Sequence, residues 1–123
     1  MRSLYQERIL QHPAHPHNFG RLPSATKKIL LDNPLCGDKI QMEVEIVNEV
    51  VVHAMFTGKG CAISKASASL LTDAAKGKTI SELRKWDKVS MIKMLGIELG
   101  PNRLKCALLP LEALQKSIGT YQL

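Results

Sequence analysis

Residues 40–56 read IQMEVEIVNEVVVHAMF, and this stretch decides the fold. Its first half alternates apolar with polar residues, and the apolar ones are Ile40, Met42, Val44 and Ile46. Such alternation is typical of a β-strand with one buried face. The second half repeats the pattern after a short turn near Asn48-Glu49. Two alternating runs joined in this way predict a β-hairpin.

A further strand and several helices surround this hairpin. Thr26–Leu31 has the character of a strand, and together with the hairpin it predicts a small antiparallel sheet. Helical spacing or capping signals mark the other segments, which are residues 3–12, 63–74, 79–86, 87–96 and 104–118. This order predicts an α+β fold: a small three-stranded antiparallel sheet with about five helices packed largely on one face. We expect one domain over residues 1–123.

Pro110 lies within the last of these predicted helices. A proline inside a helix removes one backbone hydrogen bond and clashes with the preceding turn. Two arrangements accommodate it. Either the regular helix begins around residues 106–109, which places Pro110 near its start, or the helix is kinked.

The composition is that of a globular protein. Hydrophobic residues make up 45% of the 123 residues and charged residues 23%, and the longest apolar runs are far too short to cross a bilayer. A polar helical pattern follows Met1-Arg2 in place of an apolar signal core. We therefore expect a cytoplasmic protein with no membrane partner.

The formal net charge is +6, which permits binding to nucleic acid or to an acidic partner protein. Aromatic residues make up only 4% of the chain, which argues against a surface for stacking bases. The chain has no run of Lys and Arg and no nucleic-acid-binding motif, so we expect no nucleic-acid partner. A solvated basic surface is the simpler interpretation of the charge.

The chain has three cysteines, and each lies at a predicted junction. Cys36 lies in the turn between the first two strands, Cys61 in the turn into the second helix, and Cys106 near the start of the last helix. An odd number of cysteines in a cytosolic chain argues against disulfides, and none belongs to a CxxC pair. A joint site would have to be assembled by the fold.

Asp38 follows Cys36 by two residues at the start of a predicted strand. Three thiolates and one carboxylate can complete the tetrahedral shell of a zinc ion, and thiolates prefer zinc over magnesium or calcium. Glycines beside Cys36 and Cys61 allow the backbone to approach such a centre closely. The alternative is three separately buried, unreactive cysteines.

Three cysteine-containing segments together resemble a known family. They read NPLCGD at 33–38, GKGCAISKASASLL at 58–71 and RLKCALLPLEAL at 103–114. With the segment HPHNFG at 15–20, they are similar to the SufU/IscU/NifU N-terminal family of iron–sulfur cluster assembly proteins. The resemblance runs over nearly the whole chain, and three cysteine motifs in the same order are much more specific than any one of them.

The resemblance implies a function and a set of site residues. It implies that the protein accepts persulfide sulfur from a cysteine desulfurase of the SufS type at a zinc site, and serves downstream apo iron–sulfur proteins or carriers. The implied zinc ligands are Cys36, Asp38, Cys61 and Cys106. Cys36 is the implied persulfide acceptor, and we expect a monomer. A structural zinc module that only binds partners is a further alternative.

Details around the third cysteine resemble the SufU branch. The IscU branch has a histidine just before this cysteine, whereas Lys105 stands here. Arg103 and Lys105 would place positive charge near the thiolates and attract the partner, although a solvated helix start explains them equally well. SufU proteins usually carry an insertion between the second and third cysteines, which this chain lacks. The alternative function is therefore a scaffold that assembles and transfers a [2Fe–2S] cluster on the same residues.

Overall fold

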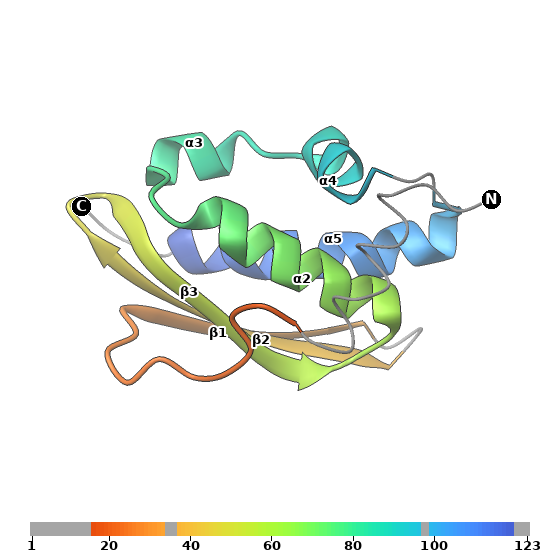
Figure 1. Ribbon diagram of the computed structural model, residues 1–123, viewed down its shortest axis with the longest axis horizontal. Coiled ribbons are helices and arrows are strands. Elements are labelled where there is room, and N and C mark those ends of the chain that lie inside the picture. The colour runs from red at the N-terminus through yellow and green to blue at the C-terminus, as the bar shows by residue number, and fades with distance from the viewer. Residues whose placement is uncertain (1–15, 34–36, 97–98, 120–123) are drawn as a thin grey trace.

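The computed structural model describes residues 16–33, 37–96 and 99–119. Three strands form one antiparallel sheet in the order β1-β2-β3, with β1 at Lys27–Asn33, β2 at Asp38–Val47 and β3 at Val50–Lys59 (Figure 1). The predicted hairpin and its added strand are confirmed. Strands β2 and β3 both extend further than the alternation indicated, toward Asp38 and Lys59.

The turn between β2 and β3 is tight. Asn48 and Glu49 have φ angles of 52° and 66°, and positive φ at both central residues is what a two-residue hairpin turn needs to match the strand twist. The register shifts between Glu45 and Ile46, so a bulge interrupts the ladder there. Past the bulge, Met42 pairs with Phe56 and Ile40 with Gly58. The hairpin therefore runs unbroken toward the end where Asp38 lies.

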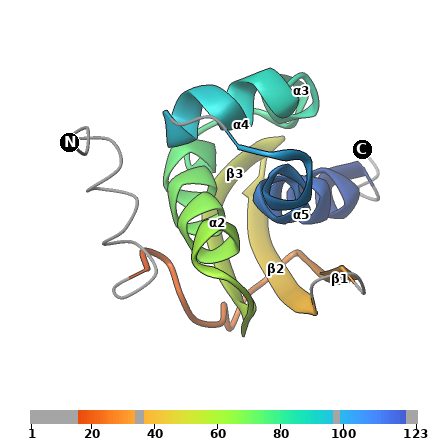
Figure 2. The same cartoon turned by 90° about the vertical axis from the view of Figure 1, so that its right-hand side faces the viewer.

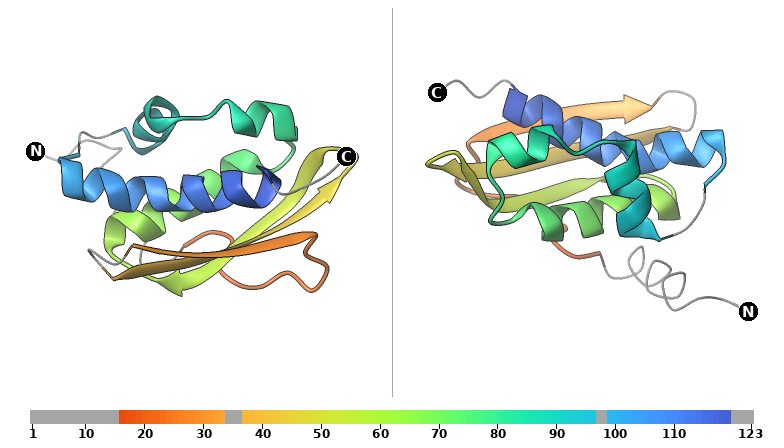
Figure 3. Two further views of the ribbon diagram at one scale, coloured as in Figure 1. Left: turned by 180° about the vertical axis from the view of Figure 1, so that it is seen from behind. Right: turned by 90° about the horizontal axis from the view of Figure 1, so that it is seen from above.

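Helices cover one face of the sheet in two tiers. The first tier is α2 at Ala62–Ala75 and α5 at Pro101–Gly119, which lie side by side against the strands (Figure 2). Above them lie α3 at Ile80–Arg84 and α4 at Lys88–Leu95, away from the sheet (Figure 3). The predicted α+β class with helices on one face is confirmed. The predicted helix at residues 3–12 lies outside the described residues, and the single domain stays a prediction.

The core lies between the sheet and the first tier of helices. Met42 and Val44 of β2 are fully buried there against Leu71 of α2 and Leu114 of α5. Burying one such side chain contributes about 1.5–3 kcal/mol to stability. Within the described residues, no helix is both long enough and apolar enough to span a membrane.

The last helix begins earlier than the sequence pattern predicted. It starts at Pro101, and Pro110 lies in its interior with its ring fully buried. The expectation of a regular helix starting around residues 106–109 is therefore wrong. The physical reason is Pro101, because proline at the first helical position has a suitable φ and loses no hydrogen bond. The backbone amide of Leu104 already donates to the Gly100 carbonyl at 2.9 Å.

The opposite face of the sheet is covered by the segment before β1. Residues 18–20 lie alongside β3, where the Gly20 amide donates to the Phe56 carbonyl at 2.8 Å, and the chain then crosses the opposite face toward β1 (Figure 1). Beneath this segment lies Glu43 of β2, whose side chain is fully buried. Its carboxylate accepts a hydrogen bond from the Leu22 amide at 3.3 Å and lies 3.6 Å from the Arg21 guanidinium and 3.9 Å from the Lys28 ammonium. The cations and the amide offset the cost of burying this charge.

The same segment is attached to the exposed side of α2. His17 Nδ1 lies 2.5 Å from Asp73 Oδ2, and the Asn18 amide donates to Asp73 Oδ1 at 2.8 Å. Burial raises the pKa of Asp73, but these hydrogen bonds and the charges of His17 and Lys76 outweigh it and hold the pKa below its usual value of 3.8. The ionised carboxylate therefore stabilises the attachment.

Asp73→Asn should lower the free energy of unfolding near neutral pH by about 0.5–1 kcal/mol, because the hydrogen bonds it loses are largely exposed. Since the folded-state pKa is lowered, this contribution is fully present above the unfolded-state pKa. It disappears as the pH falls through the folded-state value. Urea unfolding at neutral pH and well below pH 3.8 measures both effects.

A suitable control for this prediction is Glu112→Gln. It removes another exposed carboxylate, which pairs with Lys116 at 3.1 Å one helical turn away. It should cost less than about 0.5 kcal/mol. A stability difference between the wild type and Asp73→Asn that persists unchanged at acid pH would contradict the assignment.

Candidate metal centre

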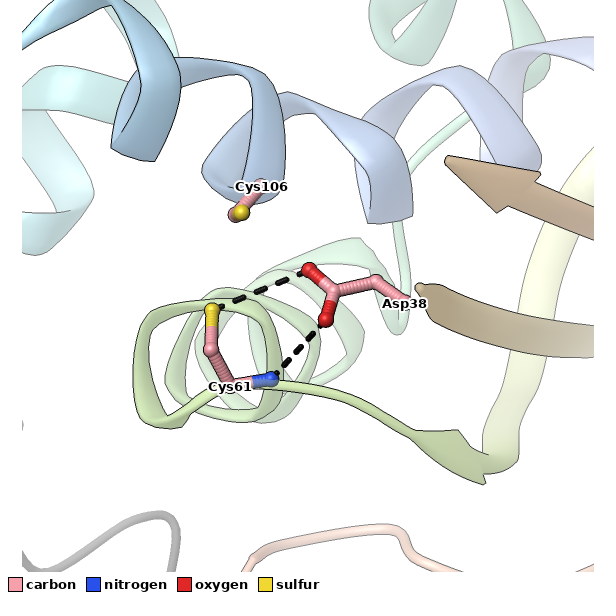
Figure 4. A group of neighbouring side chains, drawn as sticks. All are labelled: Asp38, Cys61 and Cys106. Atoms are coloured by element: carbon pink, nitrogen blue, oxygen red, sulfur yellow. Dashed lines mark hydrogen bonds between the residues drawn. The ribbon is translucent and has the colours of Figure 1, made fainter. Parts of the chain in front are cut away.

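Three elements bring a carboxylate and two thiols together at one end of the molecule. Asp38 is the first residue of β2, Cys61 directly precedes α2, and Cys106 lies in the second turn of α5. One ligand atom from each lies within 4.8 Å of the other two. Figure 4 shows the three side chains pointing toward a common space. Residues 38, 61 and 106 are far apart in the sequence, so the fold alone assembles this group.

Asp38 is the buried member at the sheet, with an exposed fraction of 2%. Its Oδ1 accepts a hydrogen bond from the backbone amide of Cys61 at 3.0 Å, and its Oδ2 lies 3.7 Å from Cys61 Sγ. A carboxylate at the amino end of a helix is favoured by the helix dipole. This bond also ties the start of β2 to the start of α2.

Cys61 caps the amino end of α2. Its backbone is extended, and its Sγ accepts a hydrogen bond from the Ser64 amide at 3.4 Å. The residue is exposed to solvent. The expectation from the sequence that Cys61 lies at the turn into this helix is confirmed. Sulfur stands here in place of the side-chain oxygen of the usual Ser, Thr or Asp cap. The thiol is a weaker cap than these oxygens but a better metal ligand.

Cys106 approaches from α5 and is buried, with an exposed fraction of 6%. Its neighbour Ala107 accepts a hydrogen bond from Ser67 Oγ of α2 at 2.5 Å through its carbonyl. This buried bond holds the two helices together one residue away from the thiol. Ala66, Leu95 and Ala107 form a small apolar cluster beside it. The distance between the two thiols is thus set by direct contact between α2 and α5.

Gly60 allows Asp38 to come close to the start of α2. A Cβ atom at this position would lie 3.0 Å from Asp38 Oδ1 and 3.1 Å from Ser64 Oγ. Such distances are tighter than ordinary carbon–oxygen contacts, so a side chain here would press against the Asp38 carboxylate and the Ser64 hydroxyl. The structure thus places this glycine against Asp38, and its expected role in a close approach to a metal centre stays a prediction.

The donor set fits a zinc ion. Zn–S bonds of about 2.3 Å and Zn–O bonds of about 2.0 Å in a tetrahedron place ligand atoms roughly 3.3–3.8 Å apart. The distance of 3.7 Å between Asp38 Oδ2 and Cys61 Sγ already lies in this range. Small shifts would bring Cys106 Sγ, within 4.8 Å of both, to the same separation. Two thiols favour zinc or iron over magnesium or calcium.

The other predicted site residues lie around this group or outside the described chain. Cys36 lies outside the described residues. The described residues that flank this stretch are bonded to each other: the Gly37 amide donates a hydrogen bond to the Asn33 carbonyl at 2.8 Å. Arg103 and Lys105 are exposed in the first two turns of α5, and neither has an ion pair within the described parts of the chain.

Two serines of α2, Ser64 and Ser67, also support the site, although no role was expected for them. Ser64 binds Cys61 Sγ through its amide, and Ser67 binds the carbonyl beside Cys106. Both are buried although they are polar. The signal was present in the sequence, because serines interrupt the apolar stripe of this helix at the turns nearest Cys61.

Comparison with known proteins identifies the family. The model of the NifU-like N-terminal domain matches residues 4–123. The chain belongs to this family. It is 35% identical to the zinc-dependent sulfurtransferase SufU of Bacillus subtilis (strain 168), over 95% of this chain and 90% of that protein. It is 30% identical to the iron–sulfur cluster assembly scaffold protein IscU of Rickettsia prowazekii (strain Madrid E), over 96% of this chain and 92% of that one.

Solved structures of the family share the fold. A SufU crystal structure from Fervidobacterium islandicum AW-1, described as a scaffold protein for the SUF system, superposes with a TM-score of 0.79 at 26% identity. It covers 91% of this chain and 94% of its own. A NifU-like N-terminal protein from Brucella abortus superposes with a TM-score of 0.77 at 22% identity, covering 94% of this chain and 92% of its own. The predicted resemblance is confirmed.

The lengths of the alignments differ between these two relatives. The alignment with the Bacillus SufU has 134 positions, which is 11 more than this whole chain contains, whereas that with the Rickettsia IscU has 122. Residues of the SufU relative therefore have no counterpart here. This agrees with the missing insertion noted in the sequence.

Gly60→Ala should weaken zinc binding about 10–100-fold, the usual effect of disturbing a group that orients a ligand. The added methyl group would push against Asp38 Oδ1 and Ser64 Oγ. A competition titration with a chromophoric zinc chelator measures this loss.

Gly100→Ala is the matched control, because a Cβ at Gly100 meets nothing within 4 Å. It should bind zinc as the wild type does. Equal zinc affinities for the two variants would contradict the role given to Gly60.

Proposed function

We propose that this protein acts in iron–sulfur cluster assembly as a sulfur relay. In this proposal it accepts persulfide sulfur from a SufS-type cysteine desulfurase at Cys36, beside a zinc ion held by Cys36, Asp38, Cys61 and Cys106. The observation that carries the proposal is the convergence of Asp38, Cys61 and Cys106 within 4.8 Å. The relative named as a zinc-dependent sulfurtransferase supports it.

Zinc, when bound, would offset the negative charge of three thiolates and one carboxylate and keep the thiols deprotonated. The protein contributes the arrangement of the ligands. The Cys61 amide and the amino end of α2 hold Asp38 in place, and the bond from Ser67 to Ala107 holds the helix that carries Cys106. These contacts are made between groups of the protein itself, and they position two of the proposed ligands.

Cys36 is the cysteine that we assign to the sulfur transfer. Cys61 is fixed at a helix cap and Cys106 is buried in a helix. The two helices therefore restrict the movement of both thiols. The Cys36 thiolate attacks the outer sulfur of the donor persulfide. A new S–S bond forms at Cys36 while the S–S bond of the donor breaks, and the donor cysteine leaves as a thiolate. The exchange needs no oxidant or reductant.

Arg103 and Lys105 support this role by attracting a negatively charged partner. Both are exposed and unpaired among the described residues, close in sequence to Cys106. Such charges increase the rate of encounter more than the strength of the final complex. The proposal also places the protein in the cytoplasm, where thiols stay reduced, and as a monomer.

The second candidate function is a scaffold that assembles a [2Fe–2S] cluster on the same residues and transfers it to downstream apo iron–sulfur proteins or carriers. The observation that favours it is the compactness shared with the IscU relative, itself named a scaffold protein. An oxygen ligand such as Asp38 binds iron–sulfur centres less strongly than thiolate does. A cluster held partly by a carboxylate would therefore be easy to release.

The decisive experiment mixes the purified protein with a SufS-type desulfurase and cysteine, and maps persulfides by mass spectrometry. We expect one added sulfur on Cys36 and faster turnover of the desulfurase, with both effects lost in Cys36→Ser. A chelator that removes zinc should reduce them about tenfold or more, which corresponds to at least about 1.4 kcal/mol of barrier.

The same mixture separates the alternatives. Stimulation that survives Cys36→Ser would overturn Cys36 as the acceptor. A scaffold would instead turn brown with iron and sulfide and pass its cluster to an apo-protein. A purely structural zinc module would lose stability in Cys36→Ser but would not affect the rate of any desulfurase.

A further inference from the structure

The outer edge of β3 is already paired with an extended segment at one point. The Phe56 amide donates to the Asn18 carbonyl at 2.9 Å, and the Phe56 carbonyl accepts from the Gly20 amide at 2.8 Å. Phe19 is thereby the parallel partner of Phe56, and the two rings meet edge to face with their centroids 5.4 Å apart. This edge therefore binds an added strand through backbone bonds, with a side chain of that strand packed beside the β3 side chain.

Beyond Phe56 the same edge has no partner among the described residues. The backbone groups of a strand point alternately to its two edges, so the Gly58 amide points outward as the Phe56 amide does. No backbone bond joins Gly58 to the segment that contains Gly20, and β3 is the last strand of the sheet in this part of the chain. Gly58 is also exposed. An open hydrogen-bond donor thus lies two residues past the existing pairing.

Missing side chains leave room beside this donor on the face that the helices cover. Gly58 pairs with Ile40, and both line a shallow recess together with Phe56, Gly60 and Ser64. The chain itself requires glycine at position 58, because its φ is 143° and a Cβ there would lie 2.1 Å from a backbone oxygen of β2. A glycine in a strand also allows a second backbone to approach closely. A side chain paired with Gly58 would stand in this recess, as Phe19 stands beside Phe56.

The recess adjoins the candidate metal centre. Its lining residue Gly60 lies against Asp38, because a Cβ there would be 3.0 Å from Asp38 Oδ1. Cys61 follows directly and is exposed. Side chains on one face of a strand are two residues and about 6.6–6.8 Å apart. In a strand added along this edge, the side chain two residues from the one in the recess would therefore lie beside Asp38 and the Cys61 thiol.

We propose that the free edge of β3 at Gly58 receives an extended segment of the persulfide donor as an added strand. The inference rests on the proposed function. A small apolar side chain of this segment occupies the recess, which the apolar residues Ile40 and Phe56 line. The persulfide-bearing cysteine lies two residues away along the segment, at the metal centre.

The position of the edge favours the donor as its occupant. The edge leads directly into Cys61, so a segment paired there delivers its own side chains to the thiols. Backbone bonds supply the affinity in such pairing, and the side chain in the pocket supplies the specificity. The Gly58 amide sets the position of the donor segment along β3 and takes no part in the sulfur transfer itself.

Hydrogen exchange in the wild-type protein tests the pairing. A SufS-type desulfurase is added without cysteine, and exchange at single amides is followed by mass spectrometry with electron-transfer fragmentation. We expect exchange at the Gly58 amide to slow at least tenfold in the complex, because a bonded amide exchanges only when its bond opens. The Asn48 amide, in the turn at the other end of β3, should change less than twofold. Unchanged exchange at Gly58, or the absence of any complex, would overturn the proposal.

A backbone substitution removes the donor and keeps all the other side chains. Gly58→glycolate replaces the N–H group by an ester oxygen, and ligation of a synthetic 1–60 segment to residues 61–123 at Cys61 supplies the protein. We expect the Kd for the desulfurase to rise about three- to tenfold, the usual effect of one hydrogen bond. The zinc content should stay within twofold of the wild type, which reports that the ester protein folds.

The matched control is the corresponding ester at Asn48. This residue is exposed, and its amide has no backbone hydrogen bond among the described residues. The control should leave the Kd within twofold of the wild type. Equal Kd values for the two ester proteins would contradict the pairing at Gly58.

Sulfur uptake separates this inference from the proposed function. If Gly58 is protected in the complex but Cys36 gains no sulfur, the proposed function fails and the docking edge stands. If sulfur reaches Cys36 while exchange at Gly58 is unchanged, the proposed function stands and the docking edge is wrong. Protection of Gly58 in the protein alone that increases with its concentration would identify a second copy of this chain as the occupant, and this result also contradicts the proposal.

Discussion

The hydrogen bond from the Cys61 amide to the Asp38 carboxylate is the contact on which the site depends. It joins the first residue of β2, whose carboxylate is buried, to the residue that caps α2, at 3.0 Å. The carboxylate gains a donor at the positive end of a helix, which offsets the cost of its burial. Gly60 must lie beside it, because a side chain there would push the carboxylate away. The sheet and the helix layer are thereby fixed to each other at the end where the thiols meet.

Burial on both faces of the sheet fixes the register of β2. On one face Met42 and Val44 pack beneath α2 and α5, and on the other Glu43 is enclosed by the segment that carries Arg21. Adjacent residues of β2 therefore belong to different layers, one apolar and one ionic. The strand that begins with Asp38 cannot shift by one residue without exposing the apolar set and burying the charged set in the core.

The sequence predicted local structure well because local patterns determine it. The alternation in residues 40–56 specified the hairpin, and the spacing after Cys61 specified α2. The start of α5 was misplaced because Pro110 was expected to lie near a helix start, whereas the start signal is Pro101 and Pro110 lies in the helix interior. The convergence of Asp38, Cys61 and Cys106 depends on packing between distant elements, so periodicity could not specify it and the family resemblance had to suggest it. Likewise, only the observed register shows that Lys39 of β2 is the direct partner of Lys59 of β3.

Strand β1 pairs only with β2 among the described residues, so its other side is an open sheet edge. Such an edge can template pairing with another chain and lead to aggregation, and Leu30, 65% exposed, would favour it. Charged side chains at Lys27, Lys28 and Asp32 occupy the same short strand. Each would have to be desolvated before a foreign strand could pair there. The charged side chains of β1 thus oppose pairing with a strand of another chain and so act against aggregation.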